Sequence, residues 1–187
     1  MDDLRAVHGH EVLVDGAFNG DPHPGNVLVV RRADGSCAHL ALVDYGQVKL
    51  LPAADRLRLA RLLVALASAD EAQPRHVRTV ARLVGDMGLV TARNDPDTLF
   101  RLARLYFDRD DELVTGGLHV QAYIERLQAA DPLVSAPQEF VLVARASLML
   151  RGLGHLLNQH RSAAAAWRPA AEALMREAGE DPAAVLA

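Results

Sequence analysis

Residues 14–52 read VDGAFNGDPHPGNVLVVRRADGSCAHLALVDYGQVKLLP, and the segment Asp21-Pro-His-Pro-Gly-Asn26 decides how the rest is interpreted. A residue that precedes proline is pushed out of helical conformations, so Asp21 and His23 are predicted to be extended. Gly25 permits a tight step before Asn26. We therefore predict a stiff loop that presents a carboxylate, and then an amide, at fixed positions.

Two runs of β-forming residues follow this loop, at 27–30 and 40–43, and the polar segment between them contains Asp34-Gly35. This dipeptide is a strong signal for a β-hairpin. If it forms a two-residue turn, Asn26 faces Val43 and Asp44 lies one residue beyond. Facing Cβ atoms lie roughly 5 Å apart and diagonal ones about 7–8 Å, so Asn26 and Asp44 are predicted to converge.

Carboxylate and amide oxygens at this separation suit one hydrated Mg²⁺, which makes Asn26 and Asp44 candidate metal ligands. Asp21 is not needed for the metal, and it is available to accept a proton from an attacking hydroxyl or to orient water. This is the layout of phosphoryl transfer. The alternative is a structural turn in which Asp21 caps the backbone. The motif Asp44-Tyr45-Gly46, placed at the matching end of the hairpin, argues against that alternative.

From residue 53 onward the apolar positions recur at helical spacing. Helices are predicted at 2–14, 53–69, 73–87, 97–108, 119–130, 137–160 and 164–178, and strands only at 27–30 and 40–43. Ser135-Ala-Pro-Gln138 is interpreted as a capping box that opens the helix at 137–160. Arg145 and Arg151 in that helix could pair with acidic loop residues or simply be solvated. The predicted fold class is mainly α (α+β), a hairpin followed by a helical bundle.

The 187 residues, of which 50% are hydrophobic, suit one domain over residues 1–178 with a frayed tail at 179–187. The net charge of −4 and the mixing of arginines with acids argue against nucleic-acid binding. The lone Cys37 forms no intrachain disulfide, which favours an intracellular location. We find no targeting segment and no run as long as a membrane span.

The spacing from Asp21 to Asn26 resembles that of the protein-kinase catalytic loop, and Asp44-Tyr45-Gly46 resembles the metal-binding Asp-Phe-Gly motif. Proline directly after the Asp makes residues 19–26 and 42–47 similar to the UbiB atypical kinase family, also called ADCK or aarF-domain kinases. A weaker match at 148–154 extends the resemblance over about 1–178. Aminoglycoside and choline phosphotransferases carry a similar loop, usually with Leu or another residue after the Asp, and are the second candidate.

The resemblance implies the C-terminal lobe of a protein-kinase-like fold that uses ATP and Mg²⁺. Asp21 takes the catalytic role and His23 supports the loop. Asn26 and Asp44 take the Mg²⁺ roles, and Gly46 joins them as cofactor-binding. UbiB-like proteins act as ATPases or small-molecule kinases linked to ubiquinone and isoprenoid-lipid metabolism. The implied partners are therefore a nucleotide and an isoprenoid or quinone-pathway lipid or enzyme, in mitochondria or plastids if the source is eukaryotic.

The sequence departs from this family in lacking the elements of an N-terminal lobe. It has no Gly-rich or Ala-rich phosphate loop, no strand lysine paired to a helix glutamate and no Lys-x-Gly-Gln extension. Its one lysine, Lys49, follows the metal motif and cannot clamp the nucleotide. We therefore expect an ATP-dependent phosphotransferase or ATPase in the full-length protein and little or no activity in this chain alone. The alternative is a truncated pseudokinase that binds a partner without catalysis.

Overall fold

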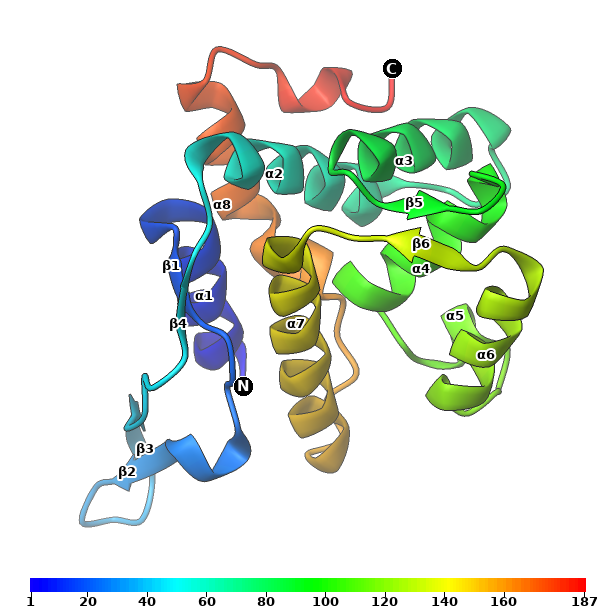
Figure 1. Cartoon of the computed structure of the whole chain (residues 1–187). Coiled ribbons are helices and arrows are strands. Elements are labelled where there is room, and N and C mark those ends of the chain that lie inside the picture. The colour runs from blue at the N-terminus through cyan, green and yellow to red at the C-terminus, as the bar shows by residue number, and fades with distance from the viewer.

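The computed structural model describes residues 1–36 and 39–187, together with the backbone of 37–38. Helices make up most of the described chain, and they are accompanied there by three two-stranded antiparallel sheets. In Figure 1, α7 (Gln138–Leu156) stands between the N-terminal helix and hairpin on one side and α4 (Pro96–Phe107) and α6 (Val120–Ala130) on the other. The predicted mainly α (α+β) fold class is confirmed.

The helices lie close to their predicted positions. The remaining long ones are α1 (Asp2–His10), which continues into the π turn η1 (Glu11–Asp15), α2 (Ala53–Ser68), α3 (Pro74–Asp86) and α8 (Ala163–Glu177). Helix α7 ends at Leu156 rather than near residue 160, and the short α5 (Glu112–Thr115) was not predicted. Asp95 caps α4 by accepting a hydrogen bond from the N–H of Thr98 at 2.9 Å.

The core is centred on α2 and α8. Leu59, Leu62 and Leu63 of α2 are fully buried, as their spacing predicts. Trp167 of α8 donates its indole N–H to the carbonyl of Arg5 at 2.9 Å. It packs so closely on α1 that a Cβ at Gly9 would lie 2.7 Å from Trp167 Cδ1. Helix α8 therefore fixes α1, and with it the start of the segment that leads to Asp21.

Two of the three small sheets were not predicted from the sequence. Strand β1 (Ala17–Asn19) pairs with β4 (Val48–Leu50), and β5 (Val90–Thr91) pairs with β6 (Leu133–Ser135). The predicted capping box is wrong, because Ser135 is the last residue of β6 and faces Val90. Pro137 occupies the N-cap position of α7 without a side-chain bond.

The base of the hairpin has the predicted register. Strand β2 (Val27–Arg31) pairs with β3 (Cys37–Leu42), and Val27 faces Leu42. The N–H of Val43 then donates to the carbonyl of Asn26 at 3.0 Å. Asn26 and Asp44 are thus brought to the same end of the hairpin.

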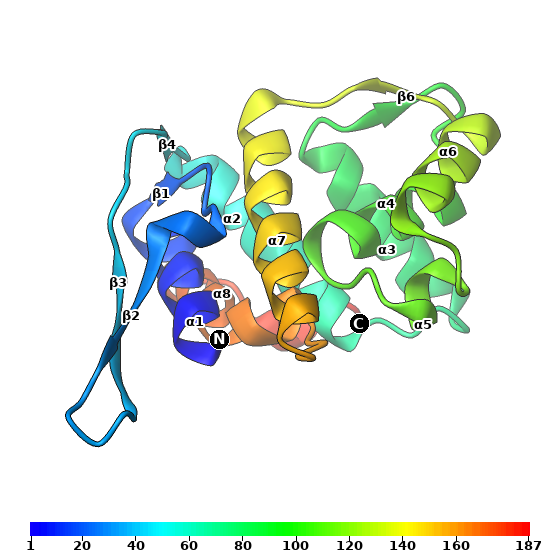
Figure 2. The same cartoon turned by 90° about the horizontal axis from the view of Figure 1, so that it is seen from below.

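The tip of the hairpin differs from the prediction. The N–H of Arg32 bonds the carbonyl of Ser36, and Gly35 has a φ of +81°, so three residues and not two form the loop. A register shift between Val30 and Arg31 offsets the extra loop residue and restores the expected pairing at the base. Figure 2 shows that the hairpin projects away from the helical body.

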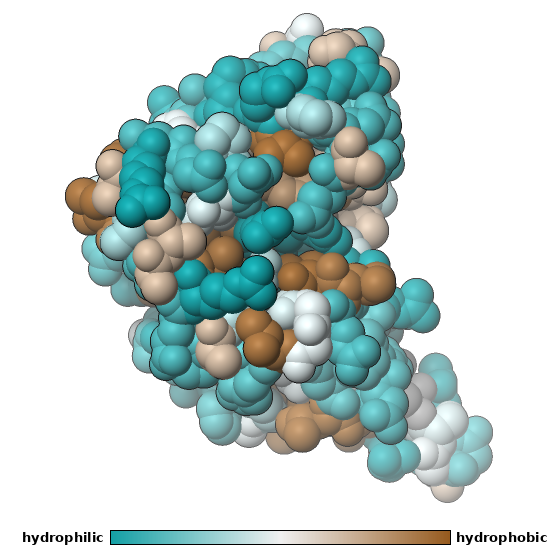
Figure 3. Space-filling model, turned by 90° about the vertical axis from the view of Figure 1, so that its right-hand side faces the viewer, coloured by the Kyte–Doolittle hydropathy of each residue, from teal (hydrophilic) through white to brown (hydrophobic). Residues whose placement is uncertain are grey.

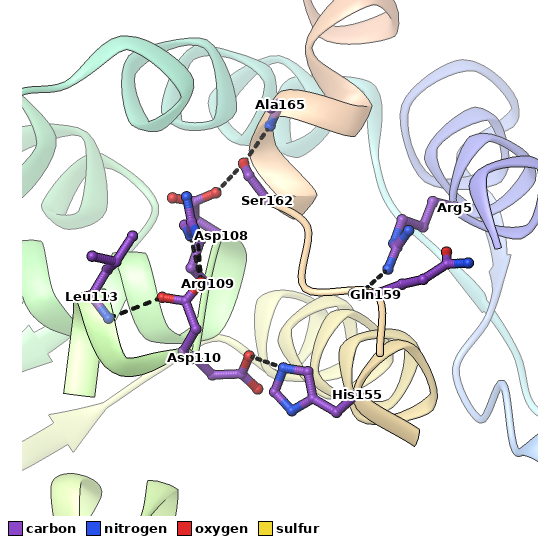
Figure 4. Close-up of polar contacts among 10 residues, drawn as sticks. Arg5, Asp108, Arg109, Asp110, Leu113, His155, Gln159, Ser162 and Ala165 are labelled. Carbon is purple, nitrogen blue, oxygen red and sulfur yellow. Dashed lines mark hydrogen bonds and ion pairs between the residues drawn. The ribbon is translucent and has the colours of Figure 1, made fainter. Parts of the chain in front are cut away.

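Polar contacts hold the connection between α7 and α8 (Figure 4). Ser162 donates its hydroxyl to the carboxylate of Asp108, and His155 Nε2 lies 3.2 Å from Asp110 Oδ1. Burial raises the pKa of the Asp108 carboxyl, and the bond from Ser162 opposes that rise. Arg5 of α1 also donates to the backbone of this connection. The end of α4 and the starts of α8 and α1 are therefore tied together.

Residues 179–187, where we predicted a frayed tail, contain the short 3-10 turn η3 (Pro182–Ala184). Pro182 is buried, and Arg61 Nε donates to Glu180 Oε2 at 2.8 Å.

The face turned to the viewer in Figure 3 is mainly hydrophilic, with hydrophobic residues dispersed among polar ones. Among the helices described, none combines the length and the apolar character needed to span a bilayer.

Candidate functional site

A cavity of about 280 Å³ lies between the loop that follows β1 and the segment that precedes β4. It brings together four of the five predicted site residues, namely Asp21, Asn26, Asp44 and Gly46. The remaining residues of its lining are Asn19 and Gln47. The fifth predicted residue, His23, is exposed and is not part of this lining.

The loop from Asp21 to Asn26 is held by its own backbone and by His23. The N–H of Gly25 donates to Nδ1 of His23 at 3.0 Å, and the N–H of Asn26 donates to the carbonyl of His23 at 2.8 Å. His23 thereby caps a 3-10 turn, η2 (Pro24–Asn26), with an imidazole whose Nδ1 carries no proton. Through these two bonds, His23 holds the backbone of Gly25 and Asn26 in the turn.

Asn19 joins the two segments of the cavity, a role that the sequence did not reveal. It is only 3% exposed, at the end of β1. Its Nδ2 donates to the carbonyl of Asp44 at 2.8 Å, and its Oδ1 accepts from the N–H of Asp21 at 2.9 Å. The available signal was an amide placed two residues before the catalytic-type Asp21 and next to a glycine.

Strand pairing reinforces this connection. Asn19 faces Val48 in the β1–β4 sheet, and the N–H of Gly20 donates to the carbonyl of Gln47 at 2.9 Å. Two short strands of three residues each therefore fix the separation between the loop and the metal-type motif.

Asp44 is positioned by the glycine that follows it in the motif. Its Oδ1 accepts from the N–H of Gly46 at 2.7 Å. A Cβ at position 46 would lie 3.0 Å from that same Oδ1, which is tighter than ordinary contact. Glycine at this position therefore lets the carboxylate fold back over its own backbone.

Tyr45 connects the motif to the end of α1. Its hydroxyl donates to Oε1 of Glu11 at 2.8 Å, and the N–H of Asn19 donates to Oε2 of the same carboxylate at 3.4 Å. Burial, followed by the bond to Glu11 and its charge, raises the pKa of the Tyr45 phenol to about 12. Glu11, which is 8% exposed, is a second supporting residue that sequence reasoning missed.

The carboxylate of Asp21 has a partner on each oxygen. Arg145 Nη2 of α7 lies 3.3 Å from Oδ1, and Gln47 Nε2 lies 3.4 Å from Oδ2. Of the two arginines considered in this helix, Arg145 therefore pairs with the acidic loop. Arg151 is instead buried and donates to the carbonyl of Leu105. Arg145 and Gln47 place the negative charge of Asp21 at the edge of the cavity.

The donor set fits a magnesium ion that is shared with phosphate. Asn26 and Asp44 offer an amide and a carboxylate oxygen, and Mg²⁺ commonly takes one or two protein carboxylates and completes its shell with water and phosphate oxygens. Within the described residues there is no group of three or more His, Cys, Asp or Glu side chains that could hold a metal ion.

Comparison with known proteins gives a family for the segment that carries this cavity. Residues 2–77 match the ABC1 atypical kinase-like domain. Over 167 residues the chain is 26% identical to AarF domain-containing protein kinase 1 of Gallus gallus, covering 86% of this chain and 31% of the relative. Over 172 residues it is 31% identical to the probable protein kinase UbiB of Pseudomonas aeruginosa (strain LESB58), covering 89% of this chain and 30% of the relative.

The chain thus spans about a third of the length of these curated relatives. No solved structure matches it significantly. The matched segment contains the loop, the hairpin and the Asp44 motif, which are the features that carried the resemblance in the sequence. The chain is accordingly similar to the AarF and UbiB proteins, and its residues 2–77 match the ABC1 atypical kinase-like domain.

Proposed function

We propose that this chain carries the catalytic and metal-binding half of an ATP- and Mg²⁺-dependent phosphoryl-transfer site. The observation that carries the proposal is the convergence of Asp21, Asn26 and Asp44 on one cavity of about 280 Å³. An acid held apart from an amide and a second acid is the arrangement that in-line phosphoryl transfer uses.

Each residue has a distinct part in this proposal. Asp21 accepts the proton of the attacking hydroxyl or water. The oxygen of that hydroxyl or water bonds to the transferred phosphorus, and the bond from phosphorus to the bridging oxygen breaks. Asn26 and Asp44 would hold the magnesium ion, with Gly46 setting the Asp44 carboxylate. Mg-ATP held there would supply the phosphoryl group, and the metal would neutralise its charge. His23 keeps the loop in shape.

The whole activity is proposed for the longer protein and not for this chain alone. The nucleotide-clamping lysine of the kinase-like family has no counterpart here, because Lys49 lies in β4 after the metal motif. Without that clamp we expect weak nucleotide binding and little or no turnover.

The substrate class, the partner and the cellular location proposed next rest on the resemblance to UbiB-like proteins. We propose that the reaction is that of a small-molecule kinase or ATPase linked to ubiquinone or another isoprenoid lipid. A lipid or enzyme of that pathway would be the partner. In a eukaryote the location would be the mitochondrion or plastid.

Turnover of Mg-ATP in the protein extended through the preceding lobe tests the proposal. We expect Asp44→Asn to lower the rate by at least about a hundredfold, because it removes a charge from the metal site. Equal rates in the two proteins would overturn the proposed role of Asp44.

The chain itself allows a second test, with Mn²⁺ as a paramagnetic substitute for Mg²⁺. We expect Mn²⁺ together with ATP to broaden the amide resonances of Gly25 and Gly46 selectively, and Asn26→Ala to reduce the effect. Uniform broadening over the whole chain would show that no defined metal site exists at the cavity.

A binding module without catalysis is the second candidate. It is favoured by the exposed apolar side chains of the hairpin, where Leu28 and Val29 are each 50% exposed. Nucleotide binding without any turnover in the extended protein would support this candidate over the first.

A further inference from the structure

A second cavity, of about 290 Å³, is lined by residues of α7 and by residues of α4 and β6, and Figure 1 shows that α4 and β6 lie on the opposite side of α7 from the hairpin. Aliphatic and aromatic side chains of α4, β6 and α7 form it, among them Phe107, Leu133, Phe140 and Leu148. Among the described residues that line it, Arg145 is the only charged one. This apolar cavity is separate from the cavity that holds Asp21 and Asp44.

Arg145 connects the apolar cavity to Asp21. It lines the apolar cavity, and its Nη2 lies 3.3 Å from Oδ1 of Asp21. Its side chain is 50% exposed and that of Asp21 is 28% exposed. Water screens an ion pair of this kind, so the pair is weak and the guanidinium can change partner at little cost. Arg145 is therefore a movable cation at the edge of an apolar cavity.

The size and lining of the cavity define the ligand that fits it. About 290 Å³ accommodates roughly ten groups of water size, at ~30 Å³ each. The apolar lining favours a hydrocarbon, and the single guanidinium favours an anionic end over a neutral or cationic one. Tyr106 adds a neutral phenol hydroxyl, and burial raises its pKa.

We propose that this cavity binds a small amphiphilic anion, with a hydrocarbon tail of about eight carbons between α4 and α7 and a carboxylate on Arg145. Binding draws the guanidinium away from Asp21. The ligand thereby controls the charge next to the carboxylate of the other cavity. This inference goes beyond the proposed phosphoryl transfer and does not depend on it.

Arg145 couples ligand binding in the apolar cavity to the charge of Asp21. This coupling predicts the direction in which each substitution changes the affinity for the ligand. Asp21 competes with the ligand for Arg145. Replacing Asp21 by a neutral isostere releases the guanidinium, so Asp21→Asn is expected to tighten binding, whereas Arg145→Gln is expected to weaken it. A merely apolar cavity would respond to neither change.

The probe is octanoate, titrated calorimetrically into the chain below the concentration at which octanoate forms micelles. Octan-1-ol and octylamine serve as neutral and cationic analogues with the same tail. Val141→Trp, at a lining residue that is 50% exposed, fills the cavity from its rim. Val134→Trp is the matched control, because Val134 is 66% exposed and lies outside the lining.

We expect octanoate to bind about tenfold more tightly than octan-1-ol, since a charge-assisted hydrogen bond is added, and octylamine not to bind. Arg145→Gln should remove this tenfold preference. Asp21→Asn should increase octanoate affinity severalfold, Val141→Trp should abolish binding and Val134→Trp should leave it unchanged. Equal affinities for the three probes, or unchanged octanoate binding in Val141→Trp, would overturn the proposal.

Discussion

The side chain of Asn19 links the Asp21 loop to the Asp44 segment of the cavity by hydrogen bonds. Its buried amide gives one hydrogen bond to the carbonyl of Asp44 and takes one from the N–H of Asp21. A buried polar side chain contributes little net stability while satisfied, but removing it leaves its partners unsatisfied. The position of both acids therefore depends on a side chain with no chemical part in the proposed reaction.

Asn19→Leu keeps the approximate volume of the side chain and removes both bonds. We expect it to lower the free energy of unfolding by roughly 1–3 kcal/mol, measured by urea denaturation. Asn26→Ala, at a partly exposed position of the same cavity, should change it by less than about 1 kcal/mol. If the two variants are equally destabilised, the bridging role of Asn19 is wrong.

Tyr45 makes stability depend on pH at the alkaline end. Its phenol has a pKa of about 12 in the fold against an ordinary value of 10.0. The unfolded chain therefore loses this proton first, so the contribution of Tyr45 is fully present below pH 10 and is lost as pH rises toward 12.

Tyr45→Phe removes that dependence. Wild type should lose stability more steeply than Tyr45→Phe between pH 10 and 12, in denaturation curves recorded at intervals across this range. The difference between their tyrosinate absorbance titrations isolates Tyr45 from the other tyrosines. Identical pH profiles would show that burial and the bond to Glu11 do not raise the pKa of Tyr45 in solution.

The sequence predicts the residues that line the cavity better than the side chains that hold them in place. Asp21 and Asn26 stand in one short motif and Asp44 stands in a second, at the other end of the hairpin. In contrast, Asn19 reaches a partner 25 residues away, Tyr45 bonds Glu11 over 34 residues and Arg145 meets Asp21 over 124 residues. Only the packing of α7 beside the loop selects Arg145 over Arg151, and local sequence does not encode that packing.

At the scale of elements, the contact between α8 and α1 determines where the catalytic-type loop begins. Trp167 packs so closely on Gly9 that a Cβ at position 9 would lie 2.7 Å from its ring, and η1 follows α1 directly and supplies Glu11. The helices themselves were predictable, because each has enough turns to display a periodic apolar face. Strands β1 and β4, with three residues each, are too short to show a period, and their pairing is fixed by the helices around them.

Gly9→Ala tests this contact. The new Cβ would lie 2.7 Å from Trp167, whose ring is buried, so we expect a loss of about 1–3 kcal/mol in unfolding free energy. Gly85→Ala is the matched control, since Gly85 also lies in a helix, α3, and nothing approaches its Cβ position within 4 Å.

The control should stabilise the protein by about 0.5–1 kcal/mol through helix propensity. Both variants are measured by thermal and urea unfolding. A stabilising Gly9→Ala would mean that α1 and Trp167 are not in close contact.

At the scale of the whole molecule, the hairpin extends an apolar surface into solvent. Leu28, Val29 and Val43 are each at least half exposed, at 50%, 50% and 56%. Projecting strands with exposed apolar side chains promote association, because their backbone and side chains both offer contacts. The hairpin thus offers an apolar surface that is suited to contact another protein.

We expect the isolated chain to self-associate through this hairpin as its concentration rises. Leu28→Lys should shift the distribution toward monomer in sedimentation velocity experiments. Leu113→Lys, at a position in α5 that is 72% exposed, serves as the control and should leave association unchanged. Equal effects of the two substitutions would point to nonspecific adhesion.

The bulge in the hairpin has a practical consequence for protein engineering. The register shift between Val30 and Arg31 compensates for the third loop residue. The number of residues in the tip therefore does not determine the pairing at Asn26. The base is anchored separately, by the β1–β4 sheet and Asn19. An epitope or fluorophore inserted beside Gly35 would therefore sit at a permissive site, where it reports on docking of the hairpin while the geometry of Asp44 stays intact.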